Sequence, residues 1–169
     1  AGALSVSELM QETLARIELV NPKVNALVNI LSKEACEKLT SAEYPVGGAL
    51  GGMPMAIKDL ANVKGFKTTE GSPLYSERVA RKDDQMVARL RAAGALFIGK
   101  TNTPEFGLGS NTFNPVYGKT KNPYDLTKTC GGSSGGAAVA LATRMLSISD
   151  GSDMMGSLRN PAAWNNVYG

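Results

Sequence analysis

The chain has 169 residues, about the length of one domain, and it contains no histidine. Hydrophobic residues make up 43% of the chain and charged residues 20%, which argues against a disordered, collagen-like or membrane class. The 18 basic and 15 acidic residues give a net charge of +3 and are interspersed, so the charge pattern argues against direct binding of nucleic acid.

The absence of histidine limits the chemistry that the chain can perform. It removes Ser-His-Asp and Cys-His nucleophile pairs and His-rich metal sites. A general base must therefore be Lys, Asp, Glu, Tyr or a Cys thiolate. The two cysteines, Cys36 and Cys130, lie in unlike surroundings, so we expect free thiols in a reducing cytoplasm. No apolar run has the length of a membrane span, which favours a cytoplasmic protein.

The first predicted element is a helix over residues 6–20. Ser5 and Glu8 have the spacing of a capping box, and an apolar stripe with helical periodicity follows. Asn21 and Pro22 should end this helix, because proline lacks the main-chain N–H that continues it.

The next elements lead to a candidate site. Residues 24–31 fit either a strand or a loop, and residues 32–42 favour a second helix. The glycine-rich stretch 47–54 is irregular and leads into a short apolar strand over residues 55–57. The strand places Lys58 and the following aspartate at its end.

A helix-to-strand step follows. Residues 84–93 have helical periodicity and end at Gly94, and residues 95–98 form a buried strand candidate. This order is typical of an α/β fold. The segment 107–132 is rich in Asn, Gly, Thr and Pro and predicts a long irregular connection, a type of segment that is often functional.

A Gly-Ser tract, residues 131–136, opens a helix of small residues over 137–145, and residues 150–157 are loop-like again. No internal repeat or linker divides the chain.

Residues 94–101 match the nucleotide-binding P-loop pattern G-x-x-x-x-G-K-[ST] letter for letter. However, the four intervening residues are apolar and fit a strand, and Asn-Thr-Pro rather than a helix follows Thr101. We therefore interpret the segment as a strand bordered by glycines, with Lys100 as a structural residue.

Three separate segments fit one Ser/Lys hydrolytic site. Ser133 and Ser134 lie in the Gly-Ser tract, and a serine nucleophile without histidine needs a base such as a buried lysine. Lys58 follows an apolar strand, where side chains project toward the crevice of an α/β fold. Ser157 follows Met-Met-Gly, where consecutive main-chain N–H groups can form an oxyanion site.

The motifs in this order resemble the amidase signature family, which includes fatty-acid amide hydrolase and the tRNA-dependent amidotransferase A subunit. The similarity runs from about residue 5 to the last residue and is carried by the segments 52–59, 94–106, 122–124, 131–136 and 153–161. It implies the N-terminal part of an α/β fold with a mixed central sheet flanked by helices. The family also carries the Gly-Lys-Thr-Asn strand end without binding nucleotide there.

The resemblance implies a Ser-Ser-Lys triad and no metal or organic cofactor. Ser157 matches the nucleophile that forms the acyl-enzyme, Ser133 matches the bridging serine after a cis peptide bond, and Lys58 matches the base. The N–H groups of Met154, Met155, Gly156 and Ser157 would stabilise the oxyanion.

Two features depart from the family pattern. Met155 stands where the family has the first of two glycines, which predicts a narrower pocket or an altered loop. Family members are also considerably longer. We therefore expect residues 1–169 to be the N-terminal and catalytic-core portion of a single amidase domain whose C-terminal portion is absent, with exposed sheet edges and little activity in isolation.

The remaining polar residues near these motifs favour supporting roles. Ser134 should hold the loop or hydrogen-bond near the triad rather than attack. Asp59 and Asp153 fit ordinary salt-bridge residues, or residues that orient Lys58 or pair with Arg159. Cys130 lacks a histidine partner and fits a packed small residue.

The leading interpretation is an amidase that hydrolyses a carbon-nitrogen bond of a small-molecule amide. The expected partner is the missing part of the same fold, and a homodimer is compatible with it. An amidotransferase A subunit with glutaminase activity is the alternative, and a nucleotide-binding protein that uses Gly94 to Thr101 is a third.

Overall fold

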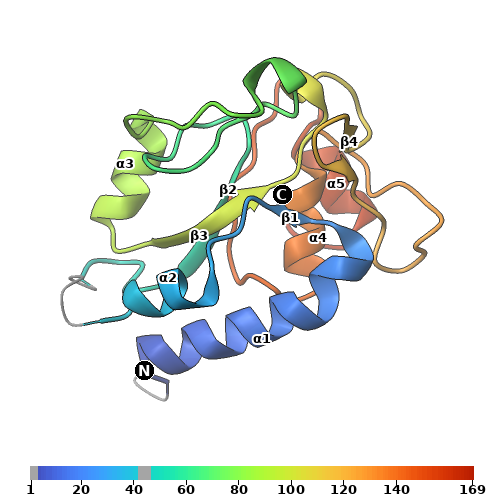
Figure 1. The fold of residues 1–169 in the computed structure, drawn as a ribbon. Coiled ribbons are helices and arrows are strands. Elements are labelled where there is room, and N and C mark those ends of the chain that lie inside the picture. The colour runs from blue at the N-terminus through green and yellow to red at the C-terminus, as the bar shows by residue number, and fades with distance from the viewer. Residues whose placement is uncertain (1–3, 42–46) are drawn as a thin grey trace.

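A mixed three-stranded sheet forms the centre of the fold in the computed structural model, which describes residues 4–41 and 47–169 (Figure 1). The strands are β1 (Leu27–Val28), β2 (Pro54–Lys58) and β3 (Leu96–Thr101), in the spatial order β1-β3-β2. Strand β3 pairs parallel with β2 and antiparallel with β1. The predicted mixed sheet of an α/β fold is therefore confirmed.

Helices cover both faces of this sheet. On one face, α1 (Val6–Val24), α2 (Lys33–Lys38) and α4 (Gly135–Ala142) pack in one apolar cluster, and on the other lies α3 (Gln85–Ala92) (Figure 1). Side chains alternate between the two clusters along β2 and β3: Ala56, Leu96 and Ile98 on the first face, Met55, Ile57 and Phe97 on the second. Both strands are consequently buried along their whole length.

The first helix is longer than the sequence predicted. Ser5 and Glu8 form the expected capping box, but α1 continues through Pro22 to Val24 and ends at Asn25 in a left-handed conformation. The prediction that Asn21 and Pro22 end the helix was therefore wrong. Asn21 accounts for the extension, because its carbonyl accepts from Asn25 N and its side chain caps the start of the next segment.

The other boundaries differ in smaller ways. Helix α2 ends at Lys38 rather than at residue 42, which lies outside the described residues. Strand β3 continues to Thr101, three residues past the predicted end, because β1 and β2 both pair with it there. Helix α4 starts at Gly135, within the Gly-Ser tract, and ends at Ala142.

The long connection is not wholly irregular. It contains a two-stranded antiparallel hairpin of β4 (Phe113–Asn114) and β5 (Gly118–Lys119). Two 3₁₀ turns, Pro73–Tyr75 and Glu105–Gly107, and the short helix α5 (Arg159–Trp164) were not predicted. Elements this short lack the two or three turns that make periodicity visible. No helix in the described ranges is long and apolar enough to cross a membrane.

Helix α4 approaches the main chain at the end of β3 closely at Gly136. A Cβ atom there would lie 2.6 Å from the Ala26 carbonyl oxygen and closer still to the Asn102 main-chain nitrogen. Gly136 N also donates to the Asn102 carbonyl at 3.2 Å. This contact sets the distance between the sheet and the tract that precedes α4.

We expect Gly136→Ala to lower the free energy of unfolding by about 1–3 kcal/mol, because the added methyl group forces backbone to move. Urea denaturation measures this change. The control is Gly47→Ala, since a Cβ atom at Gly47 would meet nothing within 4 Å, and its effect should stay within about 0.5 kcal/mol. Equal stability of the two variants would contradict the close approach at Gly136.

Candidate active site

Lys58 lies at the carboxyl end of β2 with its side chain buried among serine hydroxyls. Its exposed fraction is 1%, and its Nζ atom lies 2.8 Å from Ser133 Oγ, 2.8 Å from Ser134 Oγ and 2.9 Å from Ser152 Oγ. The apolar residues of β2 bury the strand and carry the lysine into the interior at its end. The structure thus brings Lys58 together with both serines of the Gly-Ser tract, and adds a third serine that the sequence did not indicate.

Burial changes the acidity of this lysine. It lowers the pKa of Lys58 from its ordinary value of 10.5 to about 8, while the carboxylates of Asp150 and Asp153 oppose that shift. The hydroxyl groups around Nζ carry no charge. A considerable fraction of Lys58 is therefore neutral in mildly alkaline solution and able to accept a proton.

The Gly-Ser tract presents its serines at a sharp turn before α4. The peptide bond between Gly132 and Ser133 is cis, and Ser133 and Ser134 are buried. The Ser134 hydroxyl contacts Ser152 twice: it accepts from Ser152 N at 3.2 Å and donates to the Ser152 carbonyl at 3.3 Å. Ser134 therefore joins the tract to the chain segment that leads to Ser157, as its predicted loop-holding role requires.

Ser157 faces the same cavity as Ser133. Both line a cavity of about 650 Å³, and Ser134 N donates to the Ser157 carbonyl at 2.9 Å. Ser157 Oγ has no hydrogen-bond partner among the described residues, so its predicted link to Ser133 Oγ is not formed in this structure. Hydrogen bonds between catalytic groups are often long before substrate binds.

An ion pair organises the turn before Ser157. Asp153 pairs with Arg159 through two hydrogen bonds of 2.9 and 3.0 Å, and it also accepts from Gly156 N at 2.7 Å. These contacts hold the pKa of Asp153 well below its usual range. The predicted pairing of Asp153 with Arg159 is present, and the turn that carries Ser157 is fixed by it.

One of the four expected oxyanion donors is engaged elsewhere. The Gly156 N–H points to Asp153, so the expectation that it faces the oxyanion was wrong for this structure. The N–H groups of Met154, Met155 and Ser157 have no acceptor within the described part of the chain. Asp153 accepts this N–H together with those of Leu158 and Arg159, so its carboxylate takes one of the expected donors as it holds the turn.

Two side chains that the sequence did not single out form hydrogen bonds with main-chain groups on the unpaired edge of β2. Asp150 Oδ1 accepts from Lys58 N at 2.8 Å, and Ser149 Oγ donates to the Ala56 carbonyl at 3.1 Å. The segment after α4 therefore runs along β2, as Figure 1 shows for the red chain beside this strand. Burial raises the pKa of Asp150, whereas its contacts with Lys58 oppose the rise. The only sequence signal was the small, polar composition of residues 149–152.

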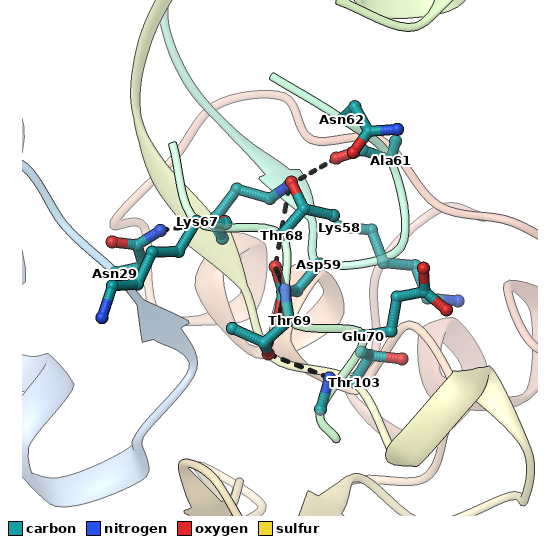
Figure 2. Close-up of polar contacts among 12 residues, drawn as sticks. Asn29, Lys58, Asp59, Ala61, Asn62, Lys67, Thr68, Thr69, Glu70 and Thr103 are labelled. Atoms are coloured by element: carbon teal, nitrogen blue, oxygen red, sulfur yellow. Dashed lines mark hydrogen bonds and ion pairs between the residues drawn. The ribbon is translucent and has the colours of Figure 1, made fainter. Parts of the chain in front are cut away.

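A second buried lysine, Lys100, has a different environment. Its Nζ lies 3.7 Å from Asp59 Oδ1, and it donates to the Ala61 carbonyl and, at 3.4 Å, to Thr68 Oγ1. Figure 2 shows Asp59 close to Thr68 and Thr69, and Thr69 Oγ1 donates to Asp59 Oδ2 at 2.5 Å. Asp59 thus forms an ion pair with Lys100 and accepts from Thr69, as expected of a salt-bridge residue, and within the described part of the chain it forms no ion pair with Lys58 or Arg159.

The arrangement around Lys100 differs from a P-loop. Lys100 lies inside β3, and the residues after Gly94 form the strand rather than an anion-binding turn before a helix. Burial lowers the pKa of Lys100 and raises that of Asp59, while each opposes the shift of the other. The interpretation of this segment as a strand with a structural lysine agrees with the geometry.

The cysteines are packed inside the protein. Cys36 and Cys130 are both buried and unbridged, and burial raises the pKa of each thiol to about 11. Cys130 is therefore a protonated thiol rather than a nucleophile at neutral pH. Within the described ranges, no three Cys, Asp or Glu side chains gather in a way that could hold a metal ion.

The sequence of this chain is similar to that of a known protein family. The profile of the family described as Amidase matches residues 8–169. The chain belongs to the amidase family. Its similarity to solved structures of amidase signature enzymes also confirms the fold predicted from the motifs.

Two relatives and two structures illustrate the similarity. The A subunit of the glutamyl-tRNA(Gln) amidotransferase from Syntrophobacter fumaroxidans is 41% identical over 98% of this chain and 35% of its own length. The indoleacetamide hydrolase of Bradyrhizobium diazoefficiens is 43% identical over 99% of this chain and 33% of its own length. The structure of 6-aminohexanoate cyclic dimer hydrolase complexed with substrate has a TM-score of 0.86 at 35% identity over 95% of this chain and 33% of that chain. Peptide amidase from Stenotrophomonas maltophilia has a TM-score of 0.84 at 31% identity, over 97% of this chain and 36% of that chain.

The chain spans about a third of the length of these relatives. The similar segment contains Lys58, the Gly-Ser tract and Ser157.

We expect Lys100→Met to lower the free energy of unfolding by about 3–5 kcal/mol, because it leaves the Asp59 carboxylate buried without its cation. The matched control is Lys67→Met, which removes an exposed pair with Glu77 and should cost at most about 1 kcal/mol. Urea denaturation distinguishes the two. Tight ATP binding that is lost in Lys100→Met would instead support the nucleotide-binding alternative.

Proposed function

We propose that this chain carries the catalytic groups of an amidase, in which Ser157 forms an acyl-enzyme and Lys58 is the base acting through Ser133. The observation that carries the proposal is the buried Lys58 side chain, whose Nζ contacts Ser133 Oγ at 2.8 Å beside the cavity that Ser157 also lines. The family supports amide hydrolysis in general.

The hydroxyl contacts favour Ser133 as the relay. The Ser134 hydroxyl donates its proton to the Ser152 carbonyl, so its oxygen receives a hydrogen bond from Lys58. The lone pair of a neutral Lys58 is then free to accept the proton of Ser133, and Ser133 in turn accepts the proton of Ser157. A rotation of the Ser157 side chain within the cavity completes this path.

The chemical steps balance without an external reagent other than water. Ser157 Oγ attacks the amide carbonyl carbon as its proton passes through Ser133 to Lys58. The tetrahedral intermediate collapses, the C–N bond breaks, and the proton returns by the same path to the leaving nitrogen. Water then attacks the ester carbonyl as one of its protons passes through Ser133 to Lys58. The C–O bond to Ser157 breaks, the carboxylic acid leaves, and the proton returns through Ser133 to Ser157 Oγ.

The main-chain groups before Ser157 would stabilise the negative oxygen. The N–H groups of Met154, Met155 and Ser157 are available, while Gly156 N–H holds Asp153. A preorganised donor of this kind contributes about 3–4 kcal/mol of transition-state stabilisation in enzymes that use one.

An amidotransferase A subunit is the second candidate. The observation that favours it is the 41% identity to an amidotransferase A subunit over the segment that holds the proposed triad. Both candidates require the same acyl-enzyme and differ in the amide and in the acceptor of the nitrogen. For either, we place the enzyme in the cytoplasm, with a small-molecule amide as its substrate and no direct contact with nucleic acid.

A fluorophosphonate probe should label the full-length protein at Ser157, because a nucleophilic serine attacks the phosphorus atom. Labelling should disappear in Ser157→Ala, fall at least about 100-fold in Ser133→Ala, which breaks the relay, and persist in Ser147→Ala, an exposed serine outside the cavity. Mass spectrometry locates the label. A label that survives Ser157→Ala and is lost in Ser133→Ala would exchange the proposed roles of the two serines.

The rate of amide hydrolysis should depend on the protonation of Lys58. Because the pKa of Lys58 is about 8 and only its neutral form accepts a proton, kcat/KM should fall below about pH 8 and approach a tenfold loss per pH unit. Above that pH the rate should level off. A rate that stays constant down to pH 6 would contradict a lysine base.

The variant Asp150→Asn tests the same assignment. It keeps an oxygen for the Lys58 N–H but removes the negative charge that favours protonated Lys58, so the acid limb of the profile should move to lower pH. Asp125→Asn, which removes an exposed carboxylate that contacts Thr127 and Lys128, should leave the profile in place. A shift of the acid limb to higher pH in Asp150→Asn would contradict the prediction that the Asp150 charge raises the pKa of Lys58.

A further inference from the structure

Thr112 is a buried threonine of the long connection and lies directly before β4. Its hydroxyl donates to the Gly131 carbonyl at 2.9 Å and accepts from Gly135 N at 3.2 Å. Its main-chain N–H donates to the same carbonyl at 3.1 Å. One residue therefore contacts the Gly-Ser tract on both sides of Ser133 and Ser134.

The main chain around Thr112 also packs directly against the tract. A Cβ atom at Gly132 would lie 3.0 Å from Asn111 N, and a Cβ atom at Gly135 would have Thr112 Oγ1 as its nearest neighbour. Side chains at these two positions would push the segments apart, so the glycines allow the close approach. The tract is therefore fitted to a segment that precedes Gly131 by 19 residues in the chain.

The Thr112 hydroxyl replaces a contact that the residue before α4 does not make. A serine at this position, the N-cap, commonly accepts from an N–H group of the first helical turn. Ser134 makes no such contact, and its hydroxyl lies 2.8 Å from Lys58 Nζ instead. Because Thr112 accepts from the N–H of Gly135, the first residue of α4, the Ser134 side chain is available to the lysine.

Only a hydroxyl group makes both contacts of the Thr112 side chain. Its proton goes to the Gly131 carbonyl, and its oxygen receives the Gly135 N–H. Valine has nearly the same shape, but it would leave the buried Gly135 N–H without this acceptor and remove one of the two bonds to the Gly131 carbonyl. The hydroxyl thus ties together the two ends of the turn that carries Ser133.

We propose that Thr112 is a positioning residue, whose hydroxyl holds the turn of the Gly-Ser tract so that Ser133 Oγ stays within hydrogen-bond distance of Lys58 Nζ. The inference rests on the proposed relay role of Ser133 and extends that role to the long connection. Thr112 does not line the cavity beside Ser157, so it acts on the reaction through the tract rather than through contact with substrate.

Labelling kinetics of the full-length protein with the fluorophosphonate probe test this inference. The labelling rate constant at saturating probe reports the chemical step, and the probe concentration that gives half of this rate reports binding. In Thr112→Val the rate constant should fall about 10- to 100-fold, with the half-rate concentration unchanged within about twofold, because a displaced Ser133 no longer relays the proton.

Two further substitutions at the same position separate the hydroxyl from the shape of the side chain. Thr112→Ser keeps the hydroxyl and should retain the rate constant within about threefold. Thr112→Cys has a weak donor and acceptor in place of the hydroxyl, so its rate constant should lie about three- to tenfold below that of the unmodified protein. The thiol variant provides the comparison where Thr112→Val does not fold.

The matched control is Thr120→Val. Thr120 is also buried, and its hydroxyl likewise makes one donated and one accepted bond, to the Asn25 carbonyl at 2.6 Å and from Asn102 Nδ2 at 3.0 Å. This variant should lose stability in urea, as Thr112→Val does, but keep its labelling rate constant. Equal losses of rate in the two valine variants would overturn the inference, because they would show a general effect of destabilisation.

A double-mutant cycle distinguishes a positioning role from a purely structural one. Since Thr112 acts through Ser133, Thr112→Val should change the labelling rate constant by less than about twofold in protein that already carries Ser133→Ala. Losses that multiply in the double variant would overturn the inference. So would a Thr112→Ser variant as slow as Thr112→Val, or a Thr112→Cys variant as fast as the unmodified protein.

The same probe separates failure of this inference from failure of the proposed function. A protein that is labelled at Ser157 as fast in Thr112→Val as in the unmodified chain retains the proposed chemistry and refutes the role of Thr112. A full-length protein that is not labelled at Ser157 at all refutes the proposed function and the positioning role with it.

Discussion

The burial of one lysine side chain constrains the rest of the site. An ammonium group in a protein interior costs several kcal/mol unless polar atoms surround it. Lys58 meets this requirement with three serine hydroxyls at Nζ and with Asp150 at its main-chain nitrogen. These partners belong to the Gly-Ser tract and to the segment along β2, so both must converge on the end of that strand. The close contact of α4 with the end of β3 at Gly136 fixes the position of the tract.

The two buried lysines show how neighbours determine what a lysine can do. Lys100 has the Asp59 carboxylate at 3.7 Å and a main-chain carbonyl at its amine, contacts that favour the charged form and tie two strand ends together. The amine of Lys58 contacts hydroxyl groups, which can donate as well as accept and therefore suit both of its protonation states. The same residue type thus serves as a structural cation at one strand end and as a candidate base at the end of the adjacent strand.

Much of the fold and of the candidate site could be predicted from the sequence, because the signals are local. The apolar run before Lys58 and the glycines around Ser133 are local signals, and their order identified the family. The contact of Ser152 with Lys58 is an interaction between distant segments, and no pattern around residue 152 indicates it. The prediction that Pro22 ends α1 failed by two residues, because the helix is closed by Asn25 in a left-handed conformation rather than by the proline. The engagement of Gly156 N–H by Asp153 depends on the geometry of a turn rather than on residue type.

The hydrogen bond between Lys58 and Ser152 spans 94 residues of sequence, and this separation has a consequence for synthesis of the protein on the ribosome. The chain emerges from its N-terminus, so β2 is complete long before the serine that helps to solvate its lysine exists. Until then the lysine must remain in water and the carboxyl end of β2 must stay open. The cluster of hydroxyl groups around Lys58 Nζ therefore cannot be complete before residue 152 has been synthesised, and the carboxyl end of β2 is among the last parts of this segment to close.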